Sequence, residues 1–497
     1  MNKSGLYFFG LFVLNIFHFQ PSYGQKESIE RIFDEREALS HFRYLASDEL
    51  KGRDAGRPEI DIAAKYIAEQ FVRYGADTLS NLEDVYQFVP LLISGPPDTG
   101  TIQMGKTTLE QGNDLLVLGG GELEGAFQMV VAGHGMEKDY EDLDVKGKIV
   151  VVRVGLPDEI SPLELFAAGK EKTKLARARG AVGLIEMYNV PTTPWRLLVN
   201  YFNKSQLTLD PNPEEDGSFP YIWMKDLTGE RVKAIHSDKS SAEIIIKGKV
   251  NRKIMGRNVV AVIEGSDENL KEEYVMLSAH YDHMGIGQPN SEGDSIYNGA
   301  RDNAVGTAAL IHAAKYFTQN PPQRSILLCA WTAEEKGLLG SAYFAANPPV
   351  PLSDIKFNLN IDNAGYNDTS IVTVIGLGRT SADHHISDAV AQFGLKAIPD
   401  PAPQQGLYDR SDNVNFAKKG IPAPTFSLGF TAFDEKVAEH YHQVTDQVDN
   451  FDLDYALKYW KSFILSAEKI ANDPNKPLWI KGDKYESVSK TLYGDEY

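Results

Sequence analysis

The chain has 497 residues, a formal net charge of −19 and a hydrophobic fraction of 42%. This length exceeds one compact core, so we expect two domains or one large domain with an insertion. The acidic balance argues against a nucleic-acid-binding protein, which needs a basic face. The single cysteine, Cys329, excludes an intrachain disulfide and a cysteine-rich zinc site. Its apolar neighbours indicate a buried hydrophobic residue rather than a catalytic thiol.

Residues 1–24 predict a signal peptide. Lys3 supplies a positive charge, residues 6–19 are mostly apolar, and small residues precede a cut near Gln25. The apolar run is too short for a membrane span, and polar sequence follows it. We therefore expect an exported protein, periplasmic or secreted, without stable membrane insertion after signal removal. An uncleaved anchor is the alternative.

Residues 29–89 predict helices, since residues 62–71 place apolar side chains at helical spacing and Gly75 is a natural stop. Residues 96–250 are richer in glycine and β-forming residues. They include strand-like runs at 130–131, 148–153 and 242–247, and a helical run at 170–179 that ends at Gly180. We interpret 96–250 as a β-rich insertion that splits a second domain into residues 25–95 and 251–475. Residues 476–497 are expected to form a loose polar tail.

From residue 258 onward, short apolar runs alternate with helix-like segments. The apolar runs are 274–279, 325–331, 357–361, 371–375 and 423–427. The helix-like segments are 305–317, 338–345, 382–393 and 413–419, and a last helix covers about 453–472. This alternation predicts an α/β fold with a mixed, mostly parallel sheet sandwiched by helices.

Three of the apolar runs lead directly into histidine and acidic residues. Ligands bind outside the carboxyl ends of strands in open α/β sheets, so we expect these side chains along one rim. Carboxylates crowded there would repel each other without a cation, and a set without cysteine suits catalytic zinc. Two adjacent glutamates fit one ligand and one general base. The residues are His280, Asp282, Asp302, Glu334, Glu335 and Asp362.

Six short segments carry a family signature: AHYDHMG at 279–285, NGARDNAVG at 298–306, AWTAEEKGLLGS at 330–341, NIDNAG at 360–365, RSD at 410–412 and YHQVTD at 441–446. Together they closely resemble the M28 family of zinc aminopeptidases and carboxypeptidases, over about residues 255–472. Residues 45–53 and 63–67 match the family's N-terminal helices. The insertion resembles a protease-associated (PA) domain, notably at 140–152 and 178–183.

The resemblance implies a fold of the zinc exopeptidase type with two zinc ions per chain. His280 and Asp362 should bind one zinc, and Glu335 and His442 the other. Asp302 should bridge the two ions and be followed by a cis peptide bond. His440, two residues before His442, is the competitor for that ligand position.

The resemblance also implies roles for residues that bind no metal. Glu334 should be the general base that takes the proton from the metal-held water. Asp282 should hydrogen-bond to His280 and fix its tautomer. Arg410 and Tyr441 are candidates for substrate binding, although Arg410 could instead pair with Asp412.

The implied function is an exported exopeptidase, an aminopeptidase acting on peptide substrates. A carboxypeptidase or dipeptidase of the same family is the nearest alternative. A receptor-like binding protein and a one-zinc cyclase-like enzyme are the others. We expect His283 to be a loop residue or a neighbour of the ligands, not a ligand itself.

Overall fold

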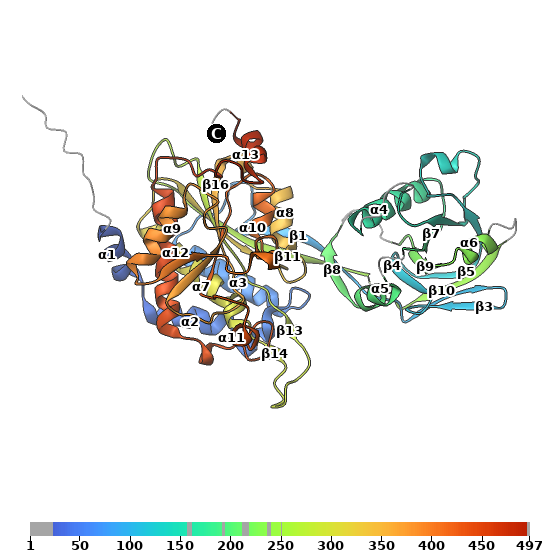
Figure 1. Ribbon diagram of the computed structural model, residues 1–497, viewed down its shortest axis with the longest axis horizontal. Coiled ribbons are helices and arrows are strands. Elements are labelled where there is room, and N and C mark those ends of the chain that lie inside the picture. Colours follow the sequence, from blue (N-terminus) through green and yellow to red (C-terminus); the bar gives the residue numbers. More distant parts are fainter. Residues whose placement is uncertain are drawn as a thin grey trace, which may run out of the picture.

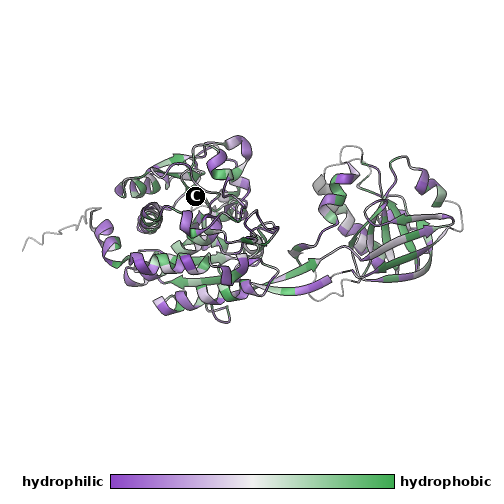
Figure 2. Ribbon diagram, turned by 90° about the horizontal axis from the view of Figure 1, so that it is seen from below, coloured by the Kyte–Doolittle hydropathy of each residue, from purple (hydrophilic) through white to green (hydrophobic). Residues whose placement is uncertain are grey.

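The computed structural model describes residues 23–156, 162–190, 194–210, 218–235, 240–249 and 251–494. The predicted signal peptide lies outside these residues except at its end. Two lobes are evident: a large α/β lobe, and a smaller β-rich lobe formed by the insertion (Figure 1). Extended strands connect them, and the view from below shows the same separation (Figure 2). No helix in the described ranges is both long and apolar enough to cross a membrane.

The large lobe opens with α1 (Tyr23–Ile32), α2 (Glu35–Leu45), η1 (Asp48–Arg53) and α3 (Glu59–Tyr74). As predicted, α3 ends at Gly75, whose φ of 97° lies in the left-handed region that glycine tolerates. The helical prediction up to residue 89 is wrong at its end, because β1 (Tyr86–Ser94) is a strand. Its aromatic and aliphatic residues favour extended backbone, and Pro90 disfavours a helix there.

A nine-stranded sheet forms the centre of the large lobe, in the order β18-β17-β19-β16-β12-β15-β11-β1-β8. The predicted mixed sheet is confirmed. β15, β12, β16 and β19 are parallel at its centre, whereas β11, β1 and β8 run antiparallel at one side. The strands are β8 (Gln206–Leu209), β11 (Asn251–Ile263), β12 (Tyr274–His280), β15 (Ser325–Trp331), β16 (Ile355–Ile361), β17 (Ile371–Ile375), β18 (Lys396–Pro399) and β19 (Thr425–Leu428).

Helices cover both faces of this sheet, as the sequence predicts. Successive strand residues face opposite cores: Leu277 and Leu328 pack on one side, and Met276 and Cys329 on the other. Burial raises the pKa of the Cys329 thiol well above its usual value, which agrees with an inert role. The first face carries α2, α3, α7 (Val305–Gln319), α9 (Asp383–Gln392) and α12 (Leu453–Ala471), and the second carries α8 (Leu339–Ala346), α10 (Asn413–Ala417) and α13 (Glu486–Tyr493).

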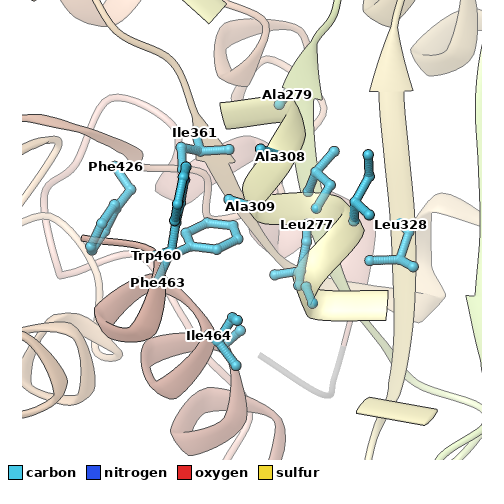
Figure 3. Close-up of a cluster of buried hydrophobic side chains, with 14 of the residues drawn as sticks. Leu277, Ala279, Ala308, Ala309, Leu328, Ile361, Phe426, Trp460, Phe463 and Ile464 are labelled. Atoms are coloured by element: carbon cyan, nitrogen blue, oxygen red, sulfur yellow. The ribbon is translucent and has the colours of Figure 1, made fainter. Parts of the chain in front are cut away.

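The first core is the larger one, and α12 supplies its aromatic centre. Trp460 and Phe463 lie close to small residues of α7, including Ala309 (Figure 3). The Trp460 ring nitrogen donates to the main-chain oxygen of Val305, the first residue of α7. The residues just before α7 are thereby anchored to the core, which matters because one of them belongs to the site.

The small lobe contains an eight-stranded sheet in the order β3-β2-β10-β5-β6-β7-β9-β4, with α4 (Pro162–Ala178), α5 (Trp195–Phe202) and α6 (Glu230–Ile235). One strand of the insertion, β8, lies outside this sheet and pairs with β1 in the large lobe. The strands of the small lobe are β2 (Thr99–Met104), β3 (Thr107–Glu110), β4 (Leu115–Gly119), β5 (Leu123–Val131), β6 (Ile149–Arg153), β7 (Gly183–Tyr188), β9 (Tyr221–Lys225) and β10 (Ser241–Lys247).

The C-terminal residues up to 494 are packed, so the expected loose tail is wrong for them. Trp479 and Tyr485 belong to the second core, and Tyr493 is also buried. The Trp479 ring nitrogen donates to the main-chain oxygen of Gly420 at 2.9 Å, and the Tyr493 hydroxyl donates to that of Ile355 at 2.6 Å. The segment packs despite its polar residues, because each of these three aromatic side chains buries a large apolar area and so stabilises the packed conformation.

Candidate metal centre

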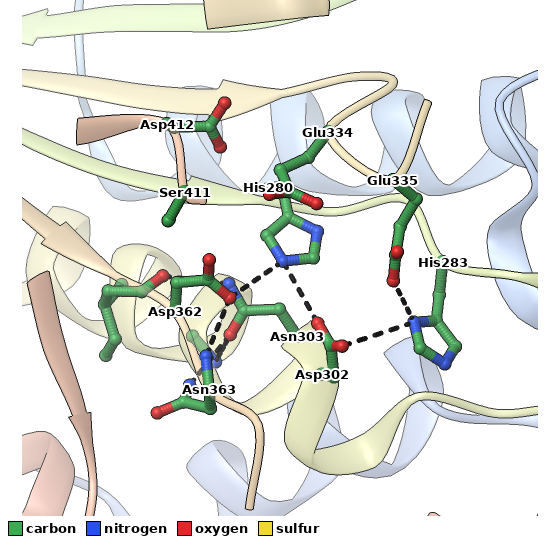
Figure 4. Close-up of polar contacts among 12 residues, drawn as sticks. His280, His283, Asp302, Asn303, Glu334, Glu335, Asp362, Asn363, Ser411 and Asp412 are labelled. Carbon is green, nitrogen blue, oxygen red and sulfur yellow. Dashed lines mark hydrogen bonds and ion pairs between the residues drawn. The ribbon is translucent and has the colours of Figure 1, made fainter. Parts of the chain in front are cut away.

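Acidic and histidine side chains from several elements meet at one rim of the large sheet, as predicted (Figure 4). His280 is the last residue of β12, and Asp362 directly follows β16. Glu334 and Glu335 follow β15 by three and four residues. Asp302 lies in the segment Ala300–Ala304 that leads into α7.

Asp302 lies between two histidines and turns one carboxylate oxygen toward each. His280 Nε2 lies 3.2 Å from Asp302 Oδ1 and 3.1 Å from Asp362 Oδ1. His442 Nε2 lies 3.1 Å from Asp302 Oδ2 and 3.5 Å from Glu335 Oε2. The structure thus brings together the five residues named from the sequence.

These separations fit zinc coordination. Zinc–nitrogen and zinc–oxygen bonds of about 2.0–2.1 Å at tetrahedral angles place neighbouring ligand atoms roughly 3.3 Å apart. The four histidine–carboxylate distances lie between 3.1 and 3.5 Å. Nitrogen and oxygen donors without sulfur are typical of catalytic zinc sites. The donor set therefore fits zinc.

The pKa shifts reflect concentrated negative charge. Burial alone would lower the pKa of His280, but the carboxylates of Asp362, Glu334 and Asp302 raise it well above its usual value. Burial would raise the pKa of Asp302, yet hydrogen bonds with His280 and His442 lower it. The pKa of His442 is raised by Asp302 and Glu335 against the effect of burial. Positive charge is therefore strongly favoured at this position.

Glu334 lies in a different environment from Glu335. Burial, together with the charges of Asp362, Asp412 and Glu335, raises the pKa of Glu334 well above its usual range. A carboxyl group whose pKa is raised in this way accepts a proton more readily than an ordinary carboxylate.

Asp282 contacts His280 through its main chain rather than its side chain. His280 Nδ1 lies 3.1 Å from the Asp282 carbonyl oxygen, whereas the Asp282 carboxylate is 3.8 Å away. The predicted hydrogen bond between Asp282 and His280 is thus present, and its acceptor is the main-chain carbonyl, which can orient the ring. The carboxylate instead accepts hydrogen bonds from the main-chain nitrogens of Glu334 at 2.9 Å and Glu335 at 3.3 Å. Asp282 thus fixes the turn that presents both glutamates.

The main chain at Asp302 is held from two sides. The Asp302–Asn303 peptide is cis, as the resemblance implied. The Asn303 side chain donates to the main-chain oxygen of Ile361 at 2.8 Å, next to Asp362. Asp446 accepts from the main-chain nitrogen of Asp302 at 3.2 Å. These bonds connect the Asp302 segment to the end of β16 and to the loop that carries His442.

The loop after α11 (Glu435–Ala438) carries both His440 and His442, and the two side chains have different partners. His440 Nδ1 lies 3.1 Å from the main-chain oxygen of Thr445, so His440 is directed away from the carboxylates that His442 meets. The Tyr441 ring stacks on His442 with centroids 4.0 Å apart. Arg410 is exposed, with Nη2 3.5 Å from the Tyr441 hydroxyl.

The alternative pairing of Arg410 with Asp412 is not among the contacts seen in the described residues. Asp412 is fully buried and accepts a hydrogen bond from Ser341. Arg410 and Tyr441 thus lie together beside His442.

Sequence reasoning missed one residue that organises the site. Arg53 is fully buried and donates to the main-chain oxygens of Leu45, Tyr281, Asn298 and Gly299, at 2.7 Å to Tyr281 and Asn298. It joins the loop after β12 to the segment before Asp302. Since its partners are main-chain atoms, most of them in distant parts of the chain, no residue spacing could have revealed them.

Two segments of the chain match known protein families. Residues 258–465 match Peptidase family M28, and residues 124–231 match the PA domain. The chain is 26% identical over 358 residues to Aminopeptidase YwaD of Bacillus subtilis (strain 168), covering 70% of this chain and 68% of that protein. It is 26% identical over 341 residues to Leucine aminopeptidase 2 of Arthroderma otae, covering 63% of this chain and 60% of that one.

A shorter match and a solved structure complete the comparison. A Probable zinc metalloprotease of Pyrenophora tritici-repentis is 36% identical over 108 residues, covering 22% of each chain. The fold resembles that of the aminopeptidase from Aneurinibacillus sp. strain AM-1, with a TM-score of 0.51 and 19% identity, over 91% of this chain and 97% of that one.

Proposed function

We propose that the chain is a dinuclear zinc aminopeptidase, because residues 258–465 match Peptidase family M28 and residues 124–231 match the PA domain. It would release single residues from the N-terminus of peptides. The observation that carries the two-zinc proposal is the position of Asp302, which turns one oxygen toward His280 and the other toward His442. A carboxylate placed in this way can bridge two ions.

The residues divide into two ligand groups. His280 and Asp362 would hold one zinc, Glu335 and His442 the other, and Asp302 both. When bound, zinc polarises the scissile carbonyl and lowers the pKa of water.

Glu334 takes a proton from the water that attacks the scissile carbonyl and returns it to the leaving amine. Its raised pKa makes Glu334 a stronger base than an ordinary carboxylate. Asp282 holds the main chain of Glu334 in place for this transfer.

The relatives favour an aminopeptidase over a carboxypeptidase, because the two long matches are to proteins named aminopeptidases. The acidic residues of the rim do not decide between the two, since the proposed zinc ions would offset their charge. A substrate carboxylate would need a cation. Among the described side chains, Arg410 at the edge is the group placed to supply one.

Blocked peptides test this choice. An aminopeptidase cleaves a dipeptide amide with a free amine and leaves the N-acetylated dipeptide intact. A carboxypeptidase shows the reverse preference. Arg410→Ala should leave kcat/KM for the dipeptide amide within about threefold, since surface charges contribute little. Faster cleavage of the N-acetylated substrate, with its loss in the Arg410 variant, would contradict the proposal. A protein that cleaves only the unblocked dipeptide would be a dipeptidase, and absence of turnover on all three substrates in the zinc-loaded protein would favour a receptor-like role.

We also propose export, on the pattern of residues 1–24. N-terminal sequencing of the protein from the periplasm or medium should begin near Gln25. Protein that retains Met1 and stays with the membrane fraction would support an uncleaved anchor.

A further inference from the structure

His283 lies beside the second ligand group, on the other side of Asp302 from His280 (Figure 4). Its side chain is fully buried. Its Nδ1 lies 2.7 Å from Glu335 Oε1 and 4.0 Å from Asp302 Oδ2. The other oxygen of Glu335, Oε2, faces His442 at 3.5 Å. Glu335 therefore contacts two imidazoles through different oxygens.

The two contacts of Glu335 differ in kind. The 3.5 Å separation from His442 is close to the roughly 3.3 Å expected between two ligands of one tetrahedral zinc. The 2.7 Å separation from His283 is shorter than that and matches a charge-assisted hydrogen bond. A metal-binding carboxylate is ionised and can only accept, so His283 Nδ1 must carry the proton.

The ring of His283 is fixed from its main chain and from its far side. Its main-chain nitrogen donates to the Arg53 carbonyl oxygen at 3.2 Å. Gly299, held by the Arg53 guanidinium, lies against the ring, and a Cβ at that position would lie 2.6 Å from the ring carbons. Within the described chain, the other ring nitrogen, Nε2, has no hydrogen-bond partner. The polar contacts of the ring are thus confined to Glu335 and Asp302.

We propose that His283 is a positioning residue for the second zinc, which holds Glu335 Oε1 so that Oε2 is left for the metal shared with His442. It is not itself a ligand. This inference rests on the proposed dinuclear site. Loss of such an outer hydrogen bond weakens metal affinity by about 10–100-fold in known sites.

The test is calorimetric titration of zinc into the metal-free full-length protein. Wild type should bind two ions. His283→Ala should bind the second ion about 10–100-fold more weakly and the first with unchanged affinity. His283→Asn should approach wild type, because its amide nitrogen can donate from nearly the same place as Nδ1. His134→Ala, at a partly exposed histidine of the small lobe whose Nδ1 lies 3.3 Å from the main-chain oxygen of Gly155, is the matched control and should titrate like wild type.

Each result separates the alternatives. Two sites of wild-type affinity in His283→Ala would overturn the role of His283 and leave the dinuclear site intact. Equal weakening in His283→Asn and His283→Ala would also overturn it, because the ring would then be a direct ligand. Fewer than two ions in wild type would contradict the dinuclear site and this inference together. Where His283→Ala does not fold, His283→Ser takes its place with the same expectation.

Discussion

Asp446 connects the loop of His442 to the segment of Asp302, so its removal should disturb both stability and the metal centre. Its carboxylate accepts from the main-chain nitrogens of Arg301 and Asp302, at 2.9 and 3.2 Å, and from the Arg301 guanidinium at 2.9 Å. Both side chains are almost fully buried. Asp446→Ala leaves the Arg301 charge buried without its partner carboxylate, a change that costs about 3–5 kcal/mol.

The expected fall in melting temperature follows from the size of the lobe. Unfolding entropy is about 2 cal/mol/K per residue, so roughly 320 residues give about 0.7 kcal/mol/K. A loss of 3–5 kcal/mol then lowers Tm by about 4–7 °C. The assay is differential scanning calorimetry of the metal-free protein, which keeps zinc loss out of the measurement. Asp434→Ala, which removes an exposed helix cap on α11, should cost only about 1 kcal/mol.

A double-mutant cycle with Arg301→Met isolates the pair. Removing the charge as well should recover part of the stability, because the buried cation is gone. If Asp446→Ala melts no lower than Asp434→Ala, the buried pair does not stabilise this junction and the reasoning fails. If the stability losses of the two single variants sum to the loss of the double variant, the two side chains are not coupled.

Three further changes test separate features. Glu334→Gln should keep zinc and lose about 10²–10⁴-fold in kcat; unchanged turnover would remove its role as base. Burial raises the pKa of Glu468 to about 7, so its carboxyl is protonated when folded at pH 5, and stability is lost as pH rises through 7. The Tm of Glu468→Gln relative to wild type should therefore rise from pH 5 to 8, and a constant difference would refute this. Gly52→Ala places a Cβ 2.5 Å from two main-chain oxygens and should destabilise far more than Gly105→Ala, where a left-handed residue has open space; equal Tm shifts would contradict the clash.

Much of the site was predictable because the ends of the parallel strands determine where the residues that follow them lie. His280 and Asp362 follow buried apolar runs, and neighbouring parallel strands must bring such residues to one rim. His442 has no such constraint. It lies in a loop with a left-handed φ of 55°, and only the family signature distinguished it from His440.

The errors arose where main-chain contacts or distant packing decide the structure. The hydrogen bond between Asp282 and His280 was predicted, but the sequence did not reveal that the carbonyl makes it and that the carboxylate holds the turn before Glu335. The segment 476–494 reads as polar, yet Trp479 fills a core formed by residues far along the chain. Arg53 donates to carbonyl oxygens, which every residue type carries, so the identities of its partner residues do not reveal these hydrogen bonds.

The central claim is that five side chains hold two zinc ions that share Asp302. Native mass spectrometry of the zinc-loaded protein measures this directly. Wild type should carry two zinc ions per chain, and Asp302→Ala should carry none. One ion in wild type, or two retained in Asp302→Ala, would contradict the shared site.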